Sequence, residues 1–283
     1  MDISKIAVIG AGTMGNGIAH VCAMNGYEVT LIDVKEDFLT RAVKTITKNC
    51  DRLVKKERMT VEDKDAMLAR ITTTTTLTDA STADFVVEAV LEDLDLKKTI
   101  FQTLDSCCKE GVILASNTSS ISIATIAAQT KRPGSVVGMH FMNPVPMMKL
   151  VEIVKGLETT DDTLKTVVDL ATKLKKTPVT VNDYPGFVAN RILMPMINEA
   201  VYCLMEGVAE AEAIDTVMKL GCAHPMGPLF LGDLIGLDVC LAIMEVLHND
   251  LGDSKYRPCP LHRNKVAAGQ LGRKSGEGFY KYD

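Results

Sequence analysis

The sequence predicts an α/β fold, a doubly wound and mostly parallel sheet followed by an all-helical C-terminal domain. Apolar, β-branched runs alternate with helical segments up to residue 183, which is the pattern of a parallel sheet covered on both faces. A break falls at Asp183-Tyr184-Pro185-Gly186, and beyond it the periodicity is that of helices. We therefore expect two domains, residues 1–183 and 184–283.

The first strand leads directly into a turn of spaced glycines. An apolar run at Lys5–Ile9 is followed by Gly10, Gly12 and Gly15, and a helix is expected at about Thr13–Met24. In this pattern the first glycine permits the tight turn, the second admits a pyrophosphate, and the third lets the helix pack on the strand. The helix directs its first amides at the phosphates. The turn therefore predicts a Rossmann-type dinucleotide site.

The second predicted strand, Tyr27–Ile32, is followed directly by the carboxylate of Asp33. A carboxylate at this position accepts hydrogen bonds from the adenosine ribose and repels a 2′-phosphate. The sequence therefore favours NAD over NADP. The alternative is that Asp33 is a solvated residue at a strand end.

The remaining elements follow in order. Between the second and third sheet segments, Lys35–Arg70 is too long for one crossover helix and predicts a helical pair that projects from the sheet. Thr72–Thr76 predicts an edge strand. Further strands are expected at residues 84–89, 112–115, 135–139, 149–154 and 177–181. Helices are expected in the C-terminal domain at Phe187–Glu206, Ala209–Leu220 and Leu231–Asn249.

Composition excludes several functional classes. The 283 residues are 47% hydrophobic and carry a net charge of −5, which argues against a nucleic-acid surface. No apolar run approaches the ~18 residues that a membrane span needs. The eight cysteines form no pattern typical of zinc sites, so no metal is expected, and they are read as reduced thiols. Because a strand begins almost at the N-terminus, no leader is expected, and we infer a cytoplasmic protein.

His140 is the leading candidate for acid–base chemistry. It follows a buried strand of the nucleotide domain, and the ligand crevice of such sheets lies at the carboxyl ends of the strands. Glu152 lies in the next strand, where a connecting loop can bring the two side chains together. A carboxylate on the far ring nitrogen would fix the tautomer and stabilise the imidazolium. The alternative is a structural histidine and a solvent-facing glutamate.

The segment Ala115–Ser120 also follows a strand and is rich in small hydrogen-bonding groups. Such a loop can bind a ligand, or it can simply cap the next helix through Ser119 or Ser120. The residues alone leave both interpretations open.

A series of motifs along the whole chain resembles the short-chain L-3-hydroxyacyl-CoA dehydrogenases, and within them the bacterial 3-hydroxybutyryl-CoA dehydrogenases most closely. The motifs are Gly10-Ala11-Gly12-Thr13-Met14-Gly15, Ser116-Asn117-Thr118-Ser119-Ser120, Gly138-Met139-His140-Phe141-Met142-Asn143-Pro144, Lys149-Leu150-Val151-Glu152, Pro185-Gly186-Phe187-Val188-Ala189-Asn190-Arg191, His224-Pro225-Met226-Gly227-Pro228 and Gly276-Glu277-Gly278-Phe279-Tyr280.

This resemblance implies roles for particular residues. His140 would be the general acid or base, Glu152 its orienting partner, Ser119 a donor to the C3 oxygen of the substrate, and Asn190 a substrate-positioning residue from the helical domain. Cofactor contacts are implied for Gly10, Gly12, Thr13, Met14, Gly15, Asp33, Glu92, Lys97, Asn117 and Asn143. Asn49 and Lys56 match the part of the helical projection that holds coenzyme A. On the residues alone, the lysines at 55 and 56 are also compatible with a solvated helix face.

The resemblance implies an enzyme that interconverts (S)-3-hydroxybutyryl-CoA and acetoacetyl-CoA with NAD. The sequence leaves two alternatives, a β-hydroxyacid dehydrogenase that acts on a free acid and a non-catalytic nucleotide-binding protein. The expected partners are the acyl-CoA substrate and a second copy of the chain, with no nucleic acid and no membrane. The helices from Phe187 and Leu231 are too apolar to bury all their side chains in one small domain, so we expect a homodimer joined through residues 187–283.

Overall fold

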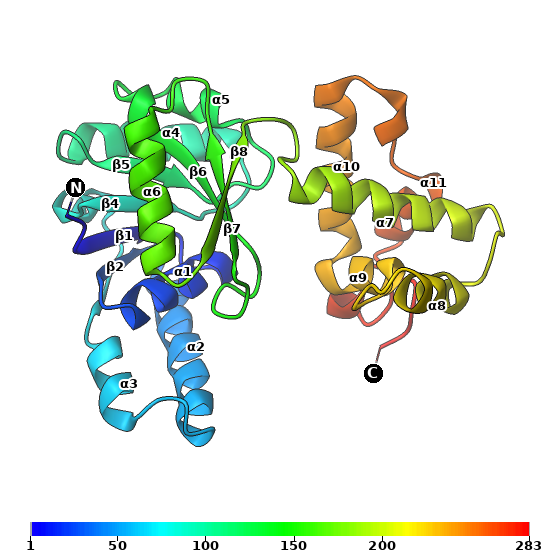
Figure 1. The fold of residues 1–283 in the computed structure, drawn as a ribbon, viewed down its shortest axis with the longest axis horizontal. Coiled ribbons are helices and arrows are strands. Elements are labelled where there is room, and N and C mark those ends of the chain that lie inside the picture. Colours follow the sequence, from blue (N-terminus) through cyan, green and yellow to red (C-terminus); the bar gives the residue numbers. More distant parts are fainter. Residues whose placement is uncertain (1, 283) are drawn as a thin grey trace. The chain divides into compact units, whose positions relative to one another are not determined.

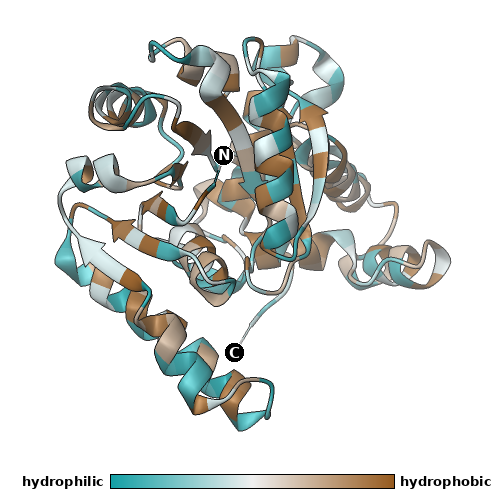
Figure 2. Ribbon diagram, turned by 60° about the vertical axis from the view of Figure 1, so that its left-hand side comes forward, coloured by the Kyte–Doolittle hydropathy of each residue, from teal (hydrophilic) through white to brown (hydrophobic). Residues whose placement is uncertain are grey.

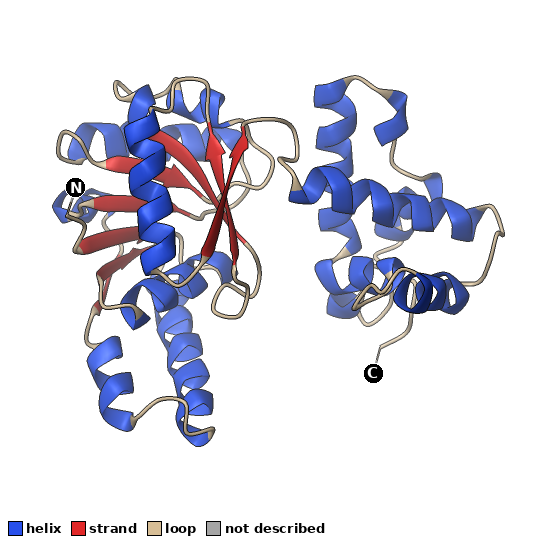
Figure 3. Cartoon of the chain, in the orientation of Figure 1, coloured by secondary structure: helices blue, strands red, loops and turns tan. Residues whose placement is uncertain are grey.

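The computed structural model describes residues 2–282 and divides into two compact units, one up to Asp183 and one from Tyr184 on (Figure 1). Among the described residues, the first unit holds one eight-stranded sheet in the order β3-β2-β1-β4-β5-β6-β7-β8. Neighbouring strands run parallel except β6 and β7, which are antiparallel. The second unit is built from helices (Figure 3). The predicted fold class is confirmed.

The sheet strands are β1 (Lys5–Ile9), β2 (Glu28–Ile32), β3 (Ile71–Thr74), β4 (Phe85–Glu88), β5 (Ile113–Ser116), β6 (Val136–Phe141), β7 (Leu150–Lys155) and β8 (Thr177–Asn182). The helices of the first unit are α1 (Thr13–Met24), α2 (Glu36–Lys55), α3 (Val61–Leu68), α4 (Leu94–Cys107), α5 (Ile123–Ala127) and α6 (Asp161–Lys173). Those of the second unit are α7 (Ala189–Met205), α8 (Ala211–Gly221), α9 (Pro228–Ile235), α10 (Leu237–Leu251) and α11 (Pro260–Ala267).

Helices cover both faces of the sheet. One apolar cluster joins alternate residues of β1 and β4 to α1, α2 and α6. Because successive side chains of a strand point to opposite faces, the residues between them face the other layer. In Figure 1, α6 lies in front of the sheet, and α4 and α5 lie behind it. The apolar runs that the sequence shows are therefore buried on both sides, as expected for a central parallel sheet.

The predicted helical pair is α2 and α3, which extend beyond the sheet (Figure 1). The long helix α2 carries both apolar and polar residues (Figure 2), and its buried side chains include Leu39 and Cys50. Beneath it lies His20 of α1, which is buried and whose Nε2 is 3.5 Å from the Cys50 Sγ. The Cys50 thiol also contacts the Met67 sulfur of α3 at 3.9 Å. This small cluster ties both projecting helices to α1.

The antiparallel pair β6 and β7 places His140 directly opposite Glu152 in the strand register. The strand β7 also pairs with β8, so it is held along both of its edges. The loop between β6 and β7 has a separate anchor, Lys176, which precedes β8. Its Nζ donates to the backbone oxygens of Val145, at 2.5 Å, and Met148, at 2.8 Å.

The structure of the helical unit corrects one helix boundary that the sequence predicts. The sequence predicts a single helix over Leu231–Asn249, whereas the structure has α9 and α10, separated at Gly236. Gly236 has φ 108°, a backbone conformation that residues with a Cβ rarely adopt, so the chain turns there instead of continuing as a helix. The sequence analysis also missed α11, which Pro260 begins.

Two buried carboxylates organise the helical unit. Asp215 accepts hydrogen bonds from the first amides of α9, those of Leu229 at 2.8 Å and Phe230 at 2.9 Å. Asp233 accepts hydrogen bonds from the amides of Phe279 and Tyr280, each at 3.0 Å. Gly227 and Gly278 leave room for these two carboxylates, because a Cβ on Gly227 would overlap Asp215 and a Cβ on Gly278 would overlap Asp233.

Candidate functional site

The glycine turn has the geometry of a phosphate cradle. Gly10 has φ 100°, and a Cβ on Gly15 would lie 1.7 Å from the Gly10 carbonyl oxygen. Gly12 differs from both, since no atom of the described chain lies within 4 Å of the place where its Cβ would be. Gly12 is also the N-cap of α1, and within residues 2–282 no side chain caps this helix end. The first amides of α1, at Thr13 and Met14, are thus available to an anion.

A cavity of about 770 Å³ opens beside this turn. Its lining includes Gly12, Asp33, Phe38 and Arg41. Asp33 uses its Oδ2 to accept a hydrogen bond from the Ala11 amide at 2.6 Å, so the carboxylate and the turn are held together. The size, the apolar lining and the single fixed carboxylate fit the adenosine half of a dinucleotide.

His140 and Glu152 are in direct contact. The His140 Nδ1 lies 2.8 Å from the Glu152 Oε2, and both side chains are buried. The contact follows from the antiparallel register, because residues directly opposite one another carry their side chains on the same face. A buried carboxylate on Nδ1 favours the tautomer with its proton there and stabilises the charged ring. The predicted pair is therefore brought together, and it is suited to proton transfer.

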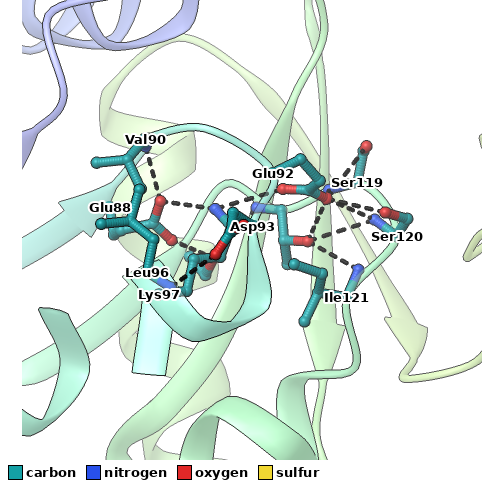
Figure 4. Close-up of polar contacts among 11 residues, drawn as sticks. Glu88, Val90, Glu92, Asp93, Leu96, Lys97, Ser119, Ser120 and Ile121 are labelled. Carbon is teal, nitrogen blue, oxygen red and sulfur yellow. Dashed lines mark hydrogen bonds and ion pairs between the residues drawn. The ribbon is translucent and has the colours of Figure 1, made fainter. Parts of the chain in front are cut away.

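The turn that follows β5 is held by Glu92. The Glu92 Oε1 accepts hydrogen bonds from the amides of Ser119, at 2.9 Å, and Ser120, at 3.1 Å, and from the Thr118 hydroxyl at 2.6 Å (Figure 4). Burial would raise the pKa of Glu92, but the charge of Lys97 and these hydrogen bonds outweigh it, so that the pKa is lowered. Glu92 is therefore a carboxylate that clamps the turn.

Neither Ser119 nor Ser120 caps a helix, so that alternative is wrong. The next helix, α5, begins at Ile123, and its N-cap is Ser122. The Ser122 hydroxyl accepts a hydrogen bond from the Thr125 amide at 3.4 Å. The capping residue lies further along the chain because the hydrogen bonds to Glu92 already fix residues 118–120 in a turn of their own.

Lys97 lies beneath Glu92 and also contacts Glu88, which the sequence analysis missed. The Lys97 Nζ is 2.6 Å from the Glu88 Oε1 and 3.3 Å from the Glu92 Oε2. Glu88 ends β4, and its second oxygen accepts a hydrogen bond from the Ser116 hydroxyl at 2.6 Å. The sequence held one signal for this contact: Glu88 is the last residue of an otherwise apolar, buried strand, and a buried carboxylate needs a hydrogen-bonding or charged partner.

The other residues predicted to contact the cofactor lie at neighbouring strand ends. Asn117 follows β5, and its Oδ1 accepts a hydrogen bond from the Phe141 amide of β6 at 2.9 Å. Asn143 is exposed in the loop after β6. Asn117 therefore fixes the strand end next to His140, and Asn143 lies in the loop that Lys176 anchors.

The residues predicted to bind the substrate are distributed over both units. Asn49 lies in α2 and is partly buried, whereas Lys56 is exposed directly after the end of this helix. Asn190 lies in the first turn of α7, in the other compact unit. Its expected approach to the substrate stays a prediction.

Across the described range 2–282, we find no group of three or more His, Cys, Asp or Glu side chains placed to hold a metal ion. Within the same range, none of the helices has the length and apolarity to cross a bilayer.

Comparison with known families gives matches along nearly the whole chain. Residues 5–184 match the family described as 3-hydroxyacyl-CoA dehydrogenase, NAD binding domain. Residues 186–282 match the family described as 3-hydroxyacyl-CoA dehydrogenase, C-terminal domain.

Individual relatives agree with these matches. The chain is 56% identical over 278 residues to a probable 3-hydroxybutyryl-CoA dehydrogenase of Deinococcus radiodurans, covering 98% of this chain and 100% of that one. It is 52% identical over 280 residues to a 3-hydroxybutyryl-CoA dehydrogenase of Bradyrhizobium diazoefficiens, with coverages of 99% and 96%. Its fold is similar to the crystal structure of (S)-3-hydroxybutyryl-CoA dehydrogenase from Ralstonia eutropha, with a TM-score of 0.97, 51% identity and full coverage of both chains.

Proposed function

This chain belongs to the 3-hydroxyacyl-CoA dehydrogenase family, and we propose that it interconverts (S)-3-hydroxybutyryl-CoA and acetoacetyl-CoA with NAD as the cofactor. The observation that carries the proposal is the buried contact of 2.8 Å between His140 and Glu152. This pair lies in the sheet that also presents the glycine turn and its cavity. A proton-transfer pair and a dinucleotide cradle are the two parts that a hydroxyl dehydrogenase requires.

In the direction of reduction, bound NADH would supply the hydride that goes to C3 of the ketone. His140 protonates the C3 oxygen as negative charge develops on it. Because Glu152 holds Nδ1, this proton leaves from Nε2, and the carboxylate keeps the ring in the orientation that the transfer needs. Ser119 donates a hydrogen bond to the same oxygen, and Asn190 helps to position the substrate. Oxidation uses the same groups in reverse.

Coenzyme A would be held by the projecting helices. Arg52 and Lys55 lie in the last turn of α2, and Lys56 follows it directly. Exposed cations at this place can pair with the phosphates of a coenzyme A nucleotide. Asn49, which lies in α2 seven residues before Lys56, would add an amide group to this site.

The same proposal includes a homodimer in the cytoplasm. Support for the dimer comes from large apolar side chains that are exposed on the helical unit, among them Ile192, Val208, Val217 and Leu220. Support for a reducing compartment comes from the cysteines, all eight of which are free thiols. Sedimentation of the active enzyme tests the dimer, and a fully active monomer would contradict it.

The activity is tested by following the absorbance of NADH during incubation with acetoacetyl-CoA. We expect oxidation of NADH, with kcat/KM at least about tenfold higher than with NADPH because Asp33 repels a 2′-phosphate. Free acetoacetate in place of acetoacetyl-CoA is the control. Turnover of the free acid alone would favour the β-hydroxyacid dehydrogenases, and no turnover of either compound would favour a non-catalytic protein.

A further inference from the structure

The cavity beside the glycine turn carries charges of both signs. Asp33 and Arg41 both contribute to its lining, and the other described residues of the lining are uncharged. Asp33 follows β2 directly, and Arg41 lies in α2, the next helix along the chain. Asp33 is half-buried, whereas Arg41 is exposed. A ligand in this cavity therefore meets a fixed negative charge and a positive charge from neighbouring elements.

One face of α2 is turned to the cavity. The residues that this helix contributes to the lining have helical spacing, namely Phe38, Arg41, Ala42 and Thr45. Lys35, Glu36 and Asp37, at the start of the helix, are not among the described residues that line the cavity. The charge that α2 offers to a ligand here is therefore that of Arg41.

Neutral groups hold the Arg41 side chain in place. Its Nε donates a hydrogen bond to the Asp37 backbone oxygen at 3.2 Å, and its Cζ lies 4.7 Å from the centre of the Phe38 ring. Neither contact cancels the positive charge, and the N–H groups of the two terminal nitrogens can donate to a ligand. A planar guanidinium suits a phosphate, because it can bind two phosphate oxygens through parallel hydrogen bonds.

Asp33 is the charge that opposes a phosphate in this cavity. Its Oδ2 accepts a hydrogen bond from the Ala11 amide at 2.6 Å, so the carboxylate is fixed at the turn. A carboxylate at this position accepts hydrogen bonds from the ribose of NAD, and the 2′-phosphate of NADP brings a second negative charge to it. Because Asp33 is fixed and half-buried while Arg41 is exposed and screened by solvent, the repulsion outweighs the attraction.

We propose that Arg41 is a second determinant of cofactor choice: it forms a latent subsite for the 2′-phosphate of NADP, which the charge of Asp33 keeps closed. This inference rests on the NAD site of the proposed function. Arg41 adds little to the binding of NAD, because NAD carries an uncharged hydroxyl at the 2′ position. Removal of the Asp33 charge opens the subsite.

The test measures the Kd of NADH and of NADPH by calorimetric titration. Asp33→Asn removes the charge but keeps the side-chain size and an oxygen for the Ala11 amide, so the turn stays in place. We expect this variant to bind NADPH at least about tenfold more tightly than the wild type does, and an excess of NADH to displace the NADPH. Addition of Arg41→Met to Asp33→Asn should then weaken NADPH binding by about tenfold and change NADH binding by less than about threefold.

The matched control is Lys44→Met in the same Asp33→Asn background. Lys44 lies about one turn after Arg41 in α2, is exposed, and is not among the described residues that line the cavity. Its loss removes the same charge from the same helix, so it should change both Kd values by less than about twofold. Salt should weaken the binding of NADPH to Asp33→Asn more steeply than that of NADH, because one more charged contact is screened.

If Asp33→Asn does not fold, Asp33→Ser gives the same test, because it also removes the charge and its hydroxyl oxygen is a hydrogen-bond acceptor. The inference is overturned if NADPH binding does not improve without the Asp33 charge, or if NADH does not displace NADPH. It is also overturned if Arg41→Met weakens the binding of NADH and NADPH equally, or if Lys44→Met has as large an effect. None of these measurements depends on turnover, so a wild type that binds NADH but does not reduce acetoacetyl-CoA would overturn the proposed function and not this inference.

Discussion

Substitution of two neighbouring glycines by alanine separates the folding role of the glycine turn from its binding role. Gly12 has φ −66° and ψ −167°, which alanine adopts readily, and the added methyl group meets no described atom within 4 Å. Gly12→Ala should therefore change the free energy of unfolding by less than about 0.5 kcal/mol. The same methyl group occupies the space beside the α1 amides, where a pyrophosphate would lie. NADH binding should weaken by at least about tenfold, or ~1.4 kcal/mol.

Gly15→Ala should do the opposite. Its methyl carbon would lie 1.7 Å from the Gly10 carbonyl oxygen, whereas ordinary van der Waals contact is 3.4–4 Å. The start of α1 must then shift away from the turn by more than the backbone around it can accommodate. Overpacking against rigid backbone of this kind should cost about 3 kcal/mol or more of stability.

Urea unfolding followed by far-ultraviolet circular dichroism gives the two stabilities, and calorimetric titration gives the Kd of NADH. Since Gly12→Ala keeps the fold, a loss of binding in that variant cannot come from unfolding. The reasoning fails if Gly12→Ala binds NADH as tightly as the wild type does, or if Gly15→Ala is equally stable.

The remaining predictions concern the acid–base pair, the acyl-CoA site and a buried histidine. His140→Gln should lower kcat by roughly 10² to 10⁴ with little change in NADH affinity, and the double variant with Glu152→Gln should lose less than the sum of the single losses; independent losses would reject the pair. Lys56→Glu should raise the KM for acetoacetyl-CoA more than that for NADH, and salt should weaken acyl-CoA binding to the wild type; unchanged acyl-CoA kinetics would favour a solvated helix face. Burial first, and the charge of Lys176 second, lower the pKa of His20 from 6.5 to about 4. As the pH falls from 6.5 towards 4, His20 therefore binds a proton in the unfolded chain but not in the folded protein. The wild type should lose up to about 3 kcal/mol of stability in this pH range, and His20→Gln should not lose it. Parallel curves of stability against pH for the two proteins would contradict this.

Elements that depend on local patterns could be predicted from the sequence. The helix expected at Thr13–Met24 is α1 with the same bounds, because the glycine turn fixes where it begins. The threonine-rich run Thr72–Thr76, predicted as an edge strand, overlaps β3 (Ile71–Thr74), which lies at one edge of the sheet. β-branched residues suit a half-covered edge strand as well as a buried one.

The boundary between α9 and α10 had signals that apolar periodicity conceals. Pro228 at the first position of α9 and Gly236 after its end are the residues that typically begin and end a helix. The side chains continue to be apolar across Gly236, so the hydrophobic pattern alone predicts one long helix. Here the backbone requirement of a single residue decided the structure.

The contacts that join Glu88 to Lys97 and Ser116 could not be predicted from the sequence, because they depend on the order of the strands. Glu88 and Ser116 are 28 residues apart and meet only because β4 and β5 are neighbours. Likewise, the spacing of His140 and Glu152 suggested a contact, but only the antiparallel direction of β7 puts them directly opposite each other. Long-range pairing of this kind leaves no periodic trace in the sequence.

The register between β6 and β7 has a consequence for how this protein can change during evolution. The contact between His140 and Glu152 is fixed by the ladder hydrogen bonds of two strands, whereas the intervening loop is fixed separately by Lys176. Insertions or deletions in the loop therefore leave the pair in place, but a slip of one residue within either strand moves one partner to the opposite face of the sheet. Changes in the loop and changes in the pair can therefore be selected independently of each other.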